Sequence, residues 1–261
     1  MSTGVWIDSA AAIAAAVAAF YAGRSAKISS KQLSEQNLQN RKLNRPRLVP
    51  YNVQLKTKVP FIHSDWQTQP DDNLKLFVSP SMSRFSIPLL NVSSYLAINV
   101  SYSFKLEGGV DSVQPYSNSD NNIAISFPDS SIRQIQPDSF SFKLTSMNDL
   151  AFLRQNINVI VDSCTNYLSI VEPNQTEKVF LPHYFIILNN IFFDDQEKFP
   201  RPTLILSLKY RDQYNNKIED LYRVRVSKKQ LQIIRSSMDY DYIESWIEFE
   251  FIKTSYVITN E

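Results

Sequence analysis

The chain has 261 residues, of which 43% are hydrophobic and 12% aromatic, so it is long and apolar enough to build a packed core. Its formal net charge of +1 excludes the general nucleic-acid affinity of a strongly basic protein, and no specific nucleic-acid partner is predicted. The only four glycines stand at positions 4, 23, 108 and 109, which leaves none for a phosphate-cradling loop and excludes P-loop and Rossmann proteins.

The first predicted element is a helix over residues 5–23, VWIDSAAAIAAAVAAFYAG, which holds a single charge, Asp8. A helix of this length covers about 28 Å and just crosses the hydrocarbon core of a bilayer. Its alanine content makes the span marginal. Trp6 and Tyr21 lie near its two ends, where aromatic rings favour the headgroup region. The stretch therefore predicts a transmembrane helix, with a soluble helix that does not insert as the alternative.

The flanks of this run argue against a cleaved secretory signal. No Lys or Arg precedes Arg24, whereas a signal begins with positive charge. Cleavage after Ala22 or Gly23 would place Phe20 or Tyr21 at a position that requires a small residue. We therefore expect the helix to stay on the chain.

Basic residues are concentrated directly after the run. Seven of the 27 fall at positions 24–47 and two of the 26 acidic residues fall before position 48, which leaves 20 basic and 24 acidic residues beyond it. The positive-inside rule then predicts a single-pass inner-membrane protein with its N-terminus outside and the rest in the cytoplasm, and the lone Cys164 agrees with a reducing compartment. The cations expected at the membrane surface are Arg24, Lys27, Lys31, Arg41 and Lys42.

Small residues follow a regular row along the predicted span. Ala11, Ala15, Ala19 and Gly23 are four positions apart, so they share one helix face. Small-xxx-small rows allow close helix packing in lipid. The row predicts association with another transmembrane helix, either a second copy or a partner's span, although alanine is also simply a good helix former.

The helix is expected to continue through the Gln- and Lys-rich stretch after Gly23 and to end before Pro46. This position separates two predicted domains. Residues 1–45 form the transmembrane and juxtamembrane helix, and residues 46–261 form one β domain.

Beyond Pro46 the dominant period of the apolar residues is two, which indicates half-buried strands. The predicted strands lie at 51–56, 74–78, 96–106, 123–127, 140–144, 157–161, 184–193 and 243–251. A hairpin is predicted over 203–227, around the turn DQYNNK. Short helices are expected at 146–155 and 227–237. The fold class is therefore mainly β, an antiparallel β-sandwich preceded by one long N-terminal helix.

No catalytic, metal-binding or cofactor-binding residue is predicted. His63 and His183 lack the spacing of a zinc site, and a pairing of Cys164 with His183 as nucleophile and base rests on no spacing argument. The acidic groups at 71–72, 194–195 and 239–244 do not match a calcium loop. Three Asn-x-Ser/Thr triplets, at Asn91, Asn99 and Asn174, are read as chance.

Four features together resemble a class of bacterial single-pass membrane proteins of unassigned activity. These features are the short N-out span, the Gln-rich helix after it, the NRPRL junction at residues 44–48 and a β domain with a YRDQYNNK hairpin. The resemblance covers the architecture and supplies no catalytic residue. It implies an accessory role in a larger membrane assembly, including assemblies that defend against phage.

Three functional hypotheses follow. The first is a non-enzymatic, membrane-anchored scaffold whose β domain binds a cytoplasmic protein. The second is a membrane effector whose helices oligomerise and permeabilise the bilayer, which ion leakage on expression would reveal. The third applies if the topology is reversed, when the β domain would be an extracytoplasmic recognition module.

Overall fold

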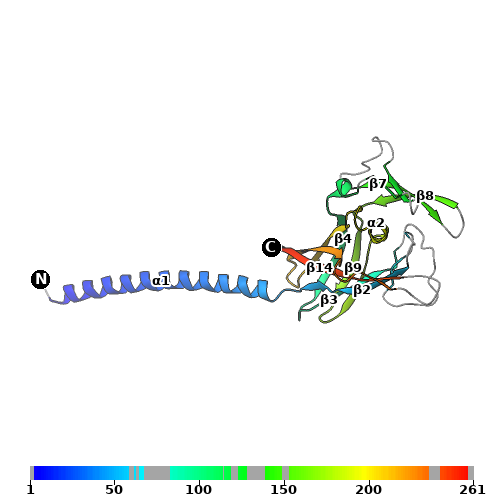
Figure 1. The fold of residues 1–261 in the computed structure, drawn as a ribbon. Coiled ribbons are helices and arrows are strands. Elements are labelled where there is room, and N and C mark those ends of the chain that lie inside the picture. The colour runs from blue at the N-terminus through cyan, green and yellow to red at the C-terminus, as the bar shows by residue number, and fades with distance from the viewer. Residues whose placement is uncertain are drawn as a thin grey trace. The chain divides into compact units, whose positions relative to one another are not determined.

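The structure is a computed structural model of the chain (Figure 1). It describes residues 3–58, 62, 65–67, 83–113, 115–118, 123–127, 139–148, 153–234 and 242–257. Of these, residues 3–16, 41–42, 58, 118, 146–148 and 153–155 are described in backbone only. The chain divides into two compact units, residues 1–45 and 46–261.

The first unit is a single helix, α1, which runs from Thr3 to Leu43. The expected continuation past Gly23 is confirmed. The amide of Asn44 still donates to the carbonyl of Asn40, at 2.9 Å, and the helix stops there because a residue before proline disfavours helical backbone. Among the residues that the structure describes, no helix has both the length and the apolar character needed to cross a membrane.

The second unit is mainly β and contains three antiparallel sheets (Figure 1). A three-stranded sheet has the order β1-β3-β10, with bounds Leu48–Pro50, Ser86–Asn91 and Thr176–Phe180. A seven-stranded sheet has the order β13-β14-β12-β11-β4-β9, with bounds Gln232–Ile234, Tyr242–Val257, Lys217–Val226, Thr203–Arg211, Ala97–Leu106 and Thr165–Val171, and β2 (Val53–Lys58) also pairs with β14. A four-stranded sheet has the order β5-β6-β7-β8, with bounds Tyr116–Asn118, Ile123–Ser126, Phe140–Asn148 and Leu153–Val161.

The core lies on the inner face of the seven-stranded sheet. Alternate residues of β11 and β12, such as Leu206 and Val224, are fully buried, while their neighbours point outward. Hydrogen bonds between described residues join the seven-stranded sheet to the three-stranded sheet, two of them through tyrosine hydroxyls. Tyr222 Oη donates to the carbonyl of Leu48 at 2.9 Å, and the amide of Phe180 donates to Tyr102 Oη at 3.3 Å. Buried apolar residues of both sheets belong to one hydrophobic core.

Most of the strands expected from alternation are confirmed. The segments at 51–56, 96–106, 123–127, 140–144, 157–161 and 243–251 correspond to β2, β4, β6, β7, β8 and β14. The hairpin over 203–227 is β11 and β12, paired without interruption from Thr203 opposite Arg225 to Arg211 opposite Lys217. The strand expected at 74–78 lies outside the described residues.

The strand expected at 184–193 is wrong, because this segment is the helix α2, His183–Asp194. Ten consecutive residues of α2, from Tyr184 to Phe193, are buried. A helix that is buried on every side shows no amphipathic stripe, so its mostly apolar sequence resembles that of a buried strand. A short 3₁₀ turn, η1, spans Gly109–Ser112 after β4.

The two short helices expected at 146–155 and 227–237 are also wrong where the structure describes them. The first segment belongs to the ends of β7 and β8, which pair from Phe140 opposite Val161 to Asn148 opposite Leu153. The second contains β13, which pairs with the start of β14. Neighbouring strands supplied the backbone partners and overrode the local helix preference in both places.

The polar side chain of Asn190 holds α2 in place within the core. Its Oδ1 accepts from Trp66 Nε1 at 2.8 Å, and its Nδ2 donates to the carbonyl of Ile62 at 2.9 Å. Replacing Asn190 by leucine, which is similar in size, removes the hydrogen-bond partner of both the Trp66 indole and the Ile62 carbonyl. We expect the free energy of unfolding to fall by about 2 kcal/mol or more, because each orphaned buried polar group costs about 1–3 kcal/mol.

Urea unfolding followed by tryptophan fluorescence measures this difference. The control is Asn166→Leu, at an exposed position on β9, where a change within about 0.5 kcal/mol is expected. Equal stability of the two variants would contradict the role given to Asn190.

Candidate functional site

The residues expected to contact the membrane or another helix all belong to α1. Those whose side chains are described, Ala19, Gly23, Arg24, Lys27 and Lys31, are exposed. The side chains of Ala11, Ala15, Arg41 and Lys42 lie outside the described residues. Apart from the backbone of α1 itself, no described residue lies within 4 Å of the position that a Cβ would take on Gly23, so this position has room for a close neighbour.

Bulky apolar side chains stand beside these small residues on α1. Val17 is 49% exposed, Phe20 67% and Tyr21 64%. The first basic residues follow within one turn, and further along Lys31 Nζ lies 3.9 Å from Glu35 on the exposed surface. The helix therefore places an apolar surface directly before a charged one.

Among the described residues, no hydrogen bond connects Cys164 with His183, the pair considered as nucleophile and base. Cys164 is exposed between β8 and β9, whereas His183 is half-buried at the start of α2 and its Nδ1 has no hydrogen-bond partner among the described residues. Within the described ranges, no three His, Cys, Asp or Glu side chains are grouped so that they could hold a metal ion. His63 and the acidic residues 71–72, 239 and 241 lie outside these ranges.

Of the acidic pair at 194–195, Asp195 has a structural role directly after α2. Asp195 accepts from Tyr116 Oη at 2.9 Å and from the backbone amide of Lys198 at 3.1 Å. Loss of hydration raises the pKa of the Asp195 carboxyl, but these hydrogen bonds and the Lys198 charge lower it more, so the net shift is downward. The carboxylate therefore ties β5 to the segment that follows α2.

The glycosylation triplets also have structural explanations. Asn91 is buried, and its Nδ2 donates to the carbonyls of Tyr95 and Val171 at 2.8 and 3.1 Å. Asn99 and Asn174 have φ values of 51° and 59°, in the left-handed region that asparagine tolerates better than most residues.

A buried aspartate shapes the β11–β12 hairpin. Asp212 accepts from the amides of Tyr214 and Asn216 at 2.8 and 2.9 Å, and from Asn216 Nδ2 at 2.8 Å. Tyr256 Oη on β14 donates to the same carboxylate at 3.0 Å. Asn215 takes a φ of 63°, which closes the turn. The sequence DQYNN thus fixes the turn and, through it, the register of both strands.

Outward-facing charges on this hairpin are mostly paired with opposite charges. Lys209 Nζ lies 3.7 Å from Glu219 directly across the two strands. Arg223 makes contacts of 2.9 Å to Glu107 and 3.1 Å to Glu250. Arg225 lies 3.5 Å from Glu248 on β14. Cross-strand ion pairs of this kind are typical of a solvent-exposed sheet face.

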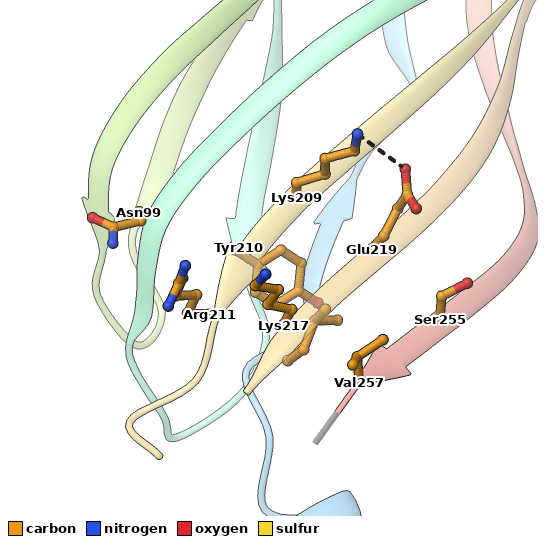
Figure 2. A pocket seen from close by; sticks show the side chains of 9 residues that line it. Asn99, Lys209, Tyr210, Arg211, Lys217, Glu219, Ser255 and Val257 are labelled. Atoms are coloured by element: carbon orange, nitrogen blue, oxygen red, sulfur yellow. Dashed lines mark ion pairs between the residues drawn. The ribbon is translucent and has the colours of Figure 1, made fainter. Parts of the chain in front are cut away.

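The last outward pair of the hairpin is different, because Arg211 stands directly opposite Lys217. The two residues lie in the wall of an open pocket of about 290 Å³ (Figure 2). The residues that line the pocket are Asn99, Lys209, Tyr210, Arg211, Lys217, Ile218, Glu219, Ser255 and Val257. The side chains therefore bring three cations and one carboxylate to this surface.

A buried hydrogen-bond network lies behind the pocket. Tyr210 Oη is 2.5 Å from Asp220 Oδ2 and 3.3 Å from the carbonyl of Pro46, and Thr254 Oγ1 also donates to Asp220. Burial raises the pKa of the Tyr222 phenol well above its ordinary value, and the nearby Asp220 adds to this rise, so Tyr222 remains a donor to Leu48. The network fastens the start of the β unit to the seven-stranded sheet.

Sequence reasoning identified the hairpin and missed the pocket. The sequence does contain a signal for the cationic surface of the pocket, since alternation places Lys209 and Arg211 on the same face of one strand. Pairing Arg211 with Lys217 required the turn length, however, and Asn99 joins the pocket only because β4 carries an extra residue where its register with β11 shifts.

His183 supplies a pH-dependent contribution to stability. Burial lowers its pKa below the ordinary value of about 6.5, and the nearby Asp65 opposes this only in part. The unfolded chain therefore binds the proton more readily than the folded chain. The stability that neutral His183 contributes is present above about pH 6.5 and is lost as the pH falls through the lowered folded pKa.

We expect His183→Gln to lose less stability than the parent protein between pH 7.5 and 5.5. Urea unfolding at the two pH values measures this difference. An equal loss in both proteins would contradict a lowered pKa at His183.

Comparison of the chain with family models, with curated proteins and with solved structures finds no match in any of the three.

Proposed function

We propose that this chain is a non-enzymatic binding protein, anchored in the inner membrane by α1, whose β unit is a sandwich that contacts a cytoplasmic partner. The observation that carries the proposal is the apolar surface of α1 immediately before its first cations. Val17, Phe20 and Tyr21 are each about half or more exposed. An apolar surface of this kind needs cover, and lipid provides it on the side of the helix that precedes Arg24.

Sequence features support the anchoring. Residues 5–23 contain one charge, and the cations after them have the distribution that the positive-inside rule associates with a cytoplasmic flank. The row Ala11, Ala15, Ala19 and Gly23 adds a face suited to a second transmembrane helix, from another copy or from a partner. The cations Arg24, Lys27 and Lys31 are exposed and available to anionic headgroups.

The β unit supplies the binding surface in this proposal. Its inner faces are apolar and pack together, and its outer face carries charged residues, among them the pocket at the end of the β11–β12 hairpin. The proposal assigns no catalytic residue.

Anchoring is tested by fractionation of cells that express the full-length chain. The wild-type protein is expected in the membrane pellet after an alkaline wash. Ala14→Arg introduces a charge at the centre of the apolar run, which costs about 2.5–3.5 kcal/mol and is enough to release a marginal span. The matched control is Ala26→Arg, at an exposed position of α1 beyond Gly23, which should remain in the pellet.

Wild-type protein in the supernatant would overturn the proposal. Ion leakage on expression, abolished by Ala15→Leu or Ala19→Leu, would favour the membrane effector in its place.

Orientation is tested separately with a reporter fused after Glu261. An enzyme that is active only in the periplasm should remain inactive there, because the cations after Gly23 retain the C-terminal side in the cytoplasm. Activity of this fusion would reverse the topology and would make the β unit an extracytoplasmic recognition module.

A further inference from the structure

The pocket at the end of the β11–β12 hairpin contains an unfavourable pair of charges. Arg211 and Lys217 occupy directly opposite positions, so their Cβ atoms are about 4.5–5.5 Å apart. Like charges at such positions destabilise a sheet. The pair therefore opposes folding in the empty protein, which indicates a use other than stability.

The other cations of these strands show that the pair is an exception. Lys209, Arg223 and Arg225 each have a carboxylate within 4 Å. Among the described residues, neither Arg211 nor Lys217 makes an ion pair. Arg211 Nη1 donates instead to Asn215 Oδ1 at 2.5 Å, a neutral acceptor in the turn.

The carboxylates close to this pair are already occupied. Glu219 lies 3.7 Å from Lys209 Nζ and accepts from Ser207 Oγ at 2.8 Å. Asp212 and Asp220 are buried on the inner side, where tyrosine, threonine, asparagine and backbone groups donate to them. The two outward cations therefore remain available to an anion from solution.

The remaining walls of the pocket suit a small organic anion. Figure 2 shows Asn99 on one side of the cationic pair and Ser255 and Val257 on the other. The amide and the hydroxyl can donate hydrogen bonds, and Val257 is an apolar side chain that is 59% exposed. A volume of about 290 Å³ exceeds the space of a bare ion and accommodates a short carbon skeleton.

We propose that this pocket binds a phosphate monoester group. Such a group carries close to two negative charges at neutral pH, which matches the two cations without carboxylate partners. The guanidinium of Arg211 can donate two parallel hydrogen bonds to phosphate oxygens, and Lys217 adds a point charge. This inference goes beyond the proposed function, because it assigns a small-anion site to the β unit that does not depend on how α1 is anchored.

The phosphate monoester can come from a soluble metabolite or from a lipid headgroup. The test uses one probe for each source, glycerol 3-phosphate and the short-chain lipid dihexanoyl phosphatidate. Glycerol and dihexanoyl phosphatidylcholine are the matched probes without the monoester. Calorimetric titration of the purified full-length protein in detergent measures each affinity.

Both monoester probes are expected to bind, and their matched probes are not. Arg211→Gln and Lys217→Gln should each weaken binding by about tenfold or more, since each removes one charge-assisted contact. Lys229→Gln removes an equal charge from an exposed turn outside the pocket and should leave binding unchanged. Markedly tighter binding of the phosphatidate would identify a lipid source, and equal affinities would identify a soluble one.

Thermal unfolding separates a lost site from a lost fold. Without a probe, the two pocket variants should melt at the same temperature as the parent or higher, because each removes the repulsion between residues 211 and 217. Wild-type protein that binds neither probe, or variants that bind as well as the parent, would overturn the inference.

The fractionation experiment distinguishes failure of the pocket inference from failure of the anchoring proposal. A chain that sediments with membranes but binds neither probe overturns the pocket inference alone. A chain that binds glycerol 3-phosphate but stays in the supernatant overturns the anchoring alone.

Discussion

The pairing of β11 with β12 is the constraint on which the rest of the β unit depends. Its nine consecutive pairs, from Thr203 opposite Arg225 to Arg211 opposite Lys217, set which side chains face the core and which face solvent. A shift by one residue would exchange the two sets, which would expose the buried leucines and bury the charged ladder. Asp212 prevents this by accepting four hydrogen bonds in and beside the turn. Local turn chemistry thus determines the placement of both the core and the pocket.

Much of the fold follows from the sequence because alternation in a half-buried strand is a strong signal. The stretch that became β4 alternates clearly, and Gly108 and Gly109 end it with positive φ values. The wrong predictions share a cause, because burial of a whole helix and pairing with a distant strand are not visible in a local sequence pattern. Every residue of α2 from Tyr184 to Phe193 is buried, so no exposed stripe marks it as a helix, and β13 exists because β14 supplies its partner. Information of this kind lies in distant parts of the chain.

The candidate site was still less accessible from the sequence. A pair of like charges across a hairpin requires the turn length, and a pocket wall requires the neighbours β4 and β14 as well. Asn99 lines the pocket because of a β-bulge in β4, which no local sequence pattern predicts. The residues of α1 are the reverse case. Their spacing could be read directly from the sequence, since a single helix fixes which residues share a face.

The network at Pro46 and Leu48 has a mechanical consequence. Tyr210 and Tyr222 hold the carbonyls of these two residues from the interior of the seven-stranded sheet. Tension applied to the residues before Pro46 would act on these two hydrogen bonds and on the pairing of β1 with β3 before it acted on the longer strand pairs. Because the same Tyr210 hydroxyl contacts Asp220 behind the pocket, a displacement of Pro46 would reach the wall of that pocket through this residue.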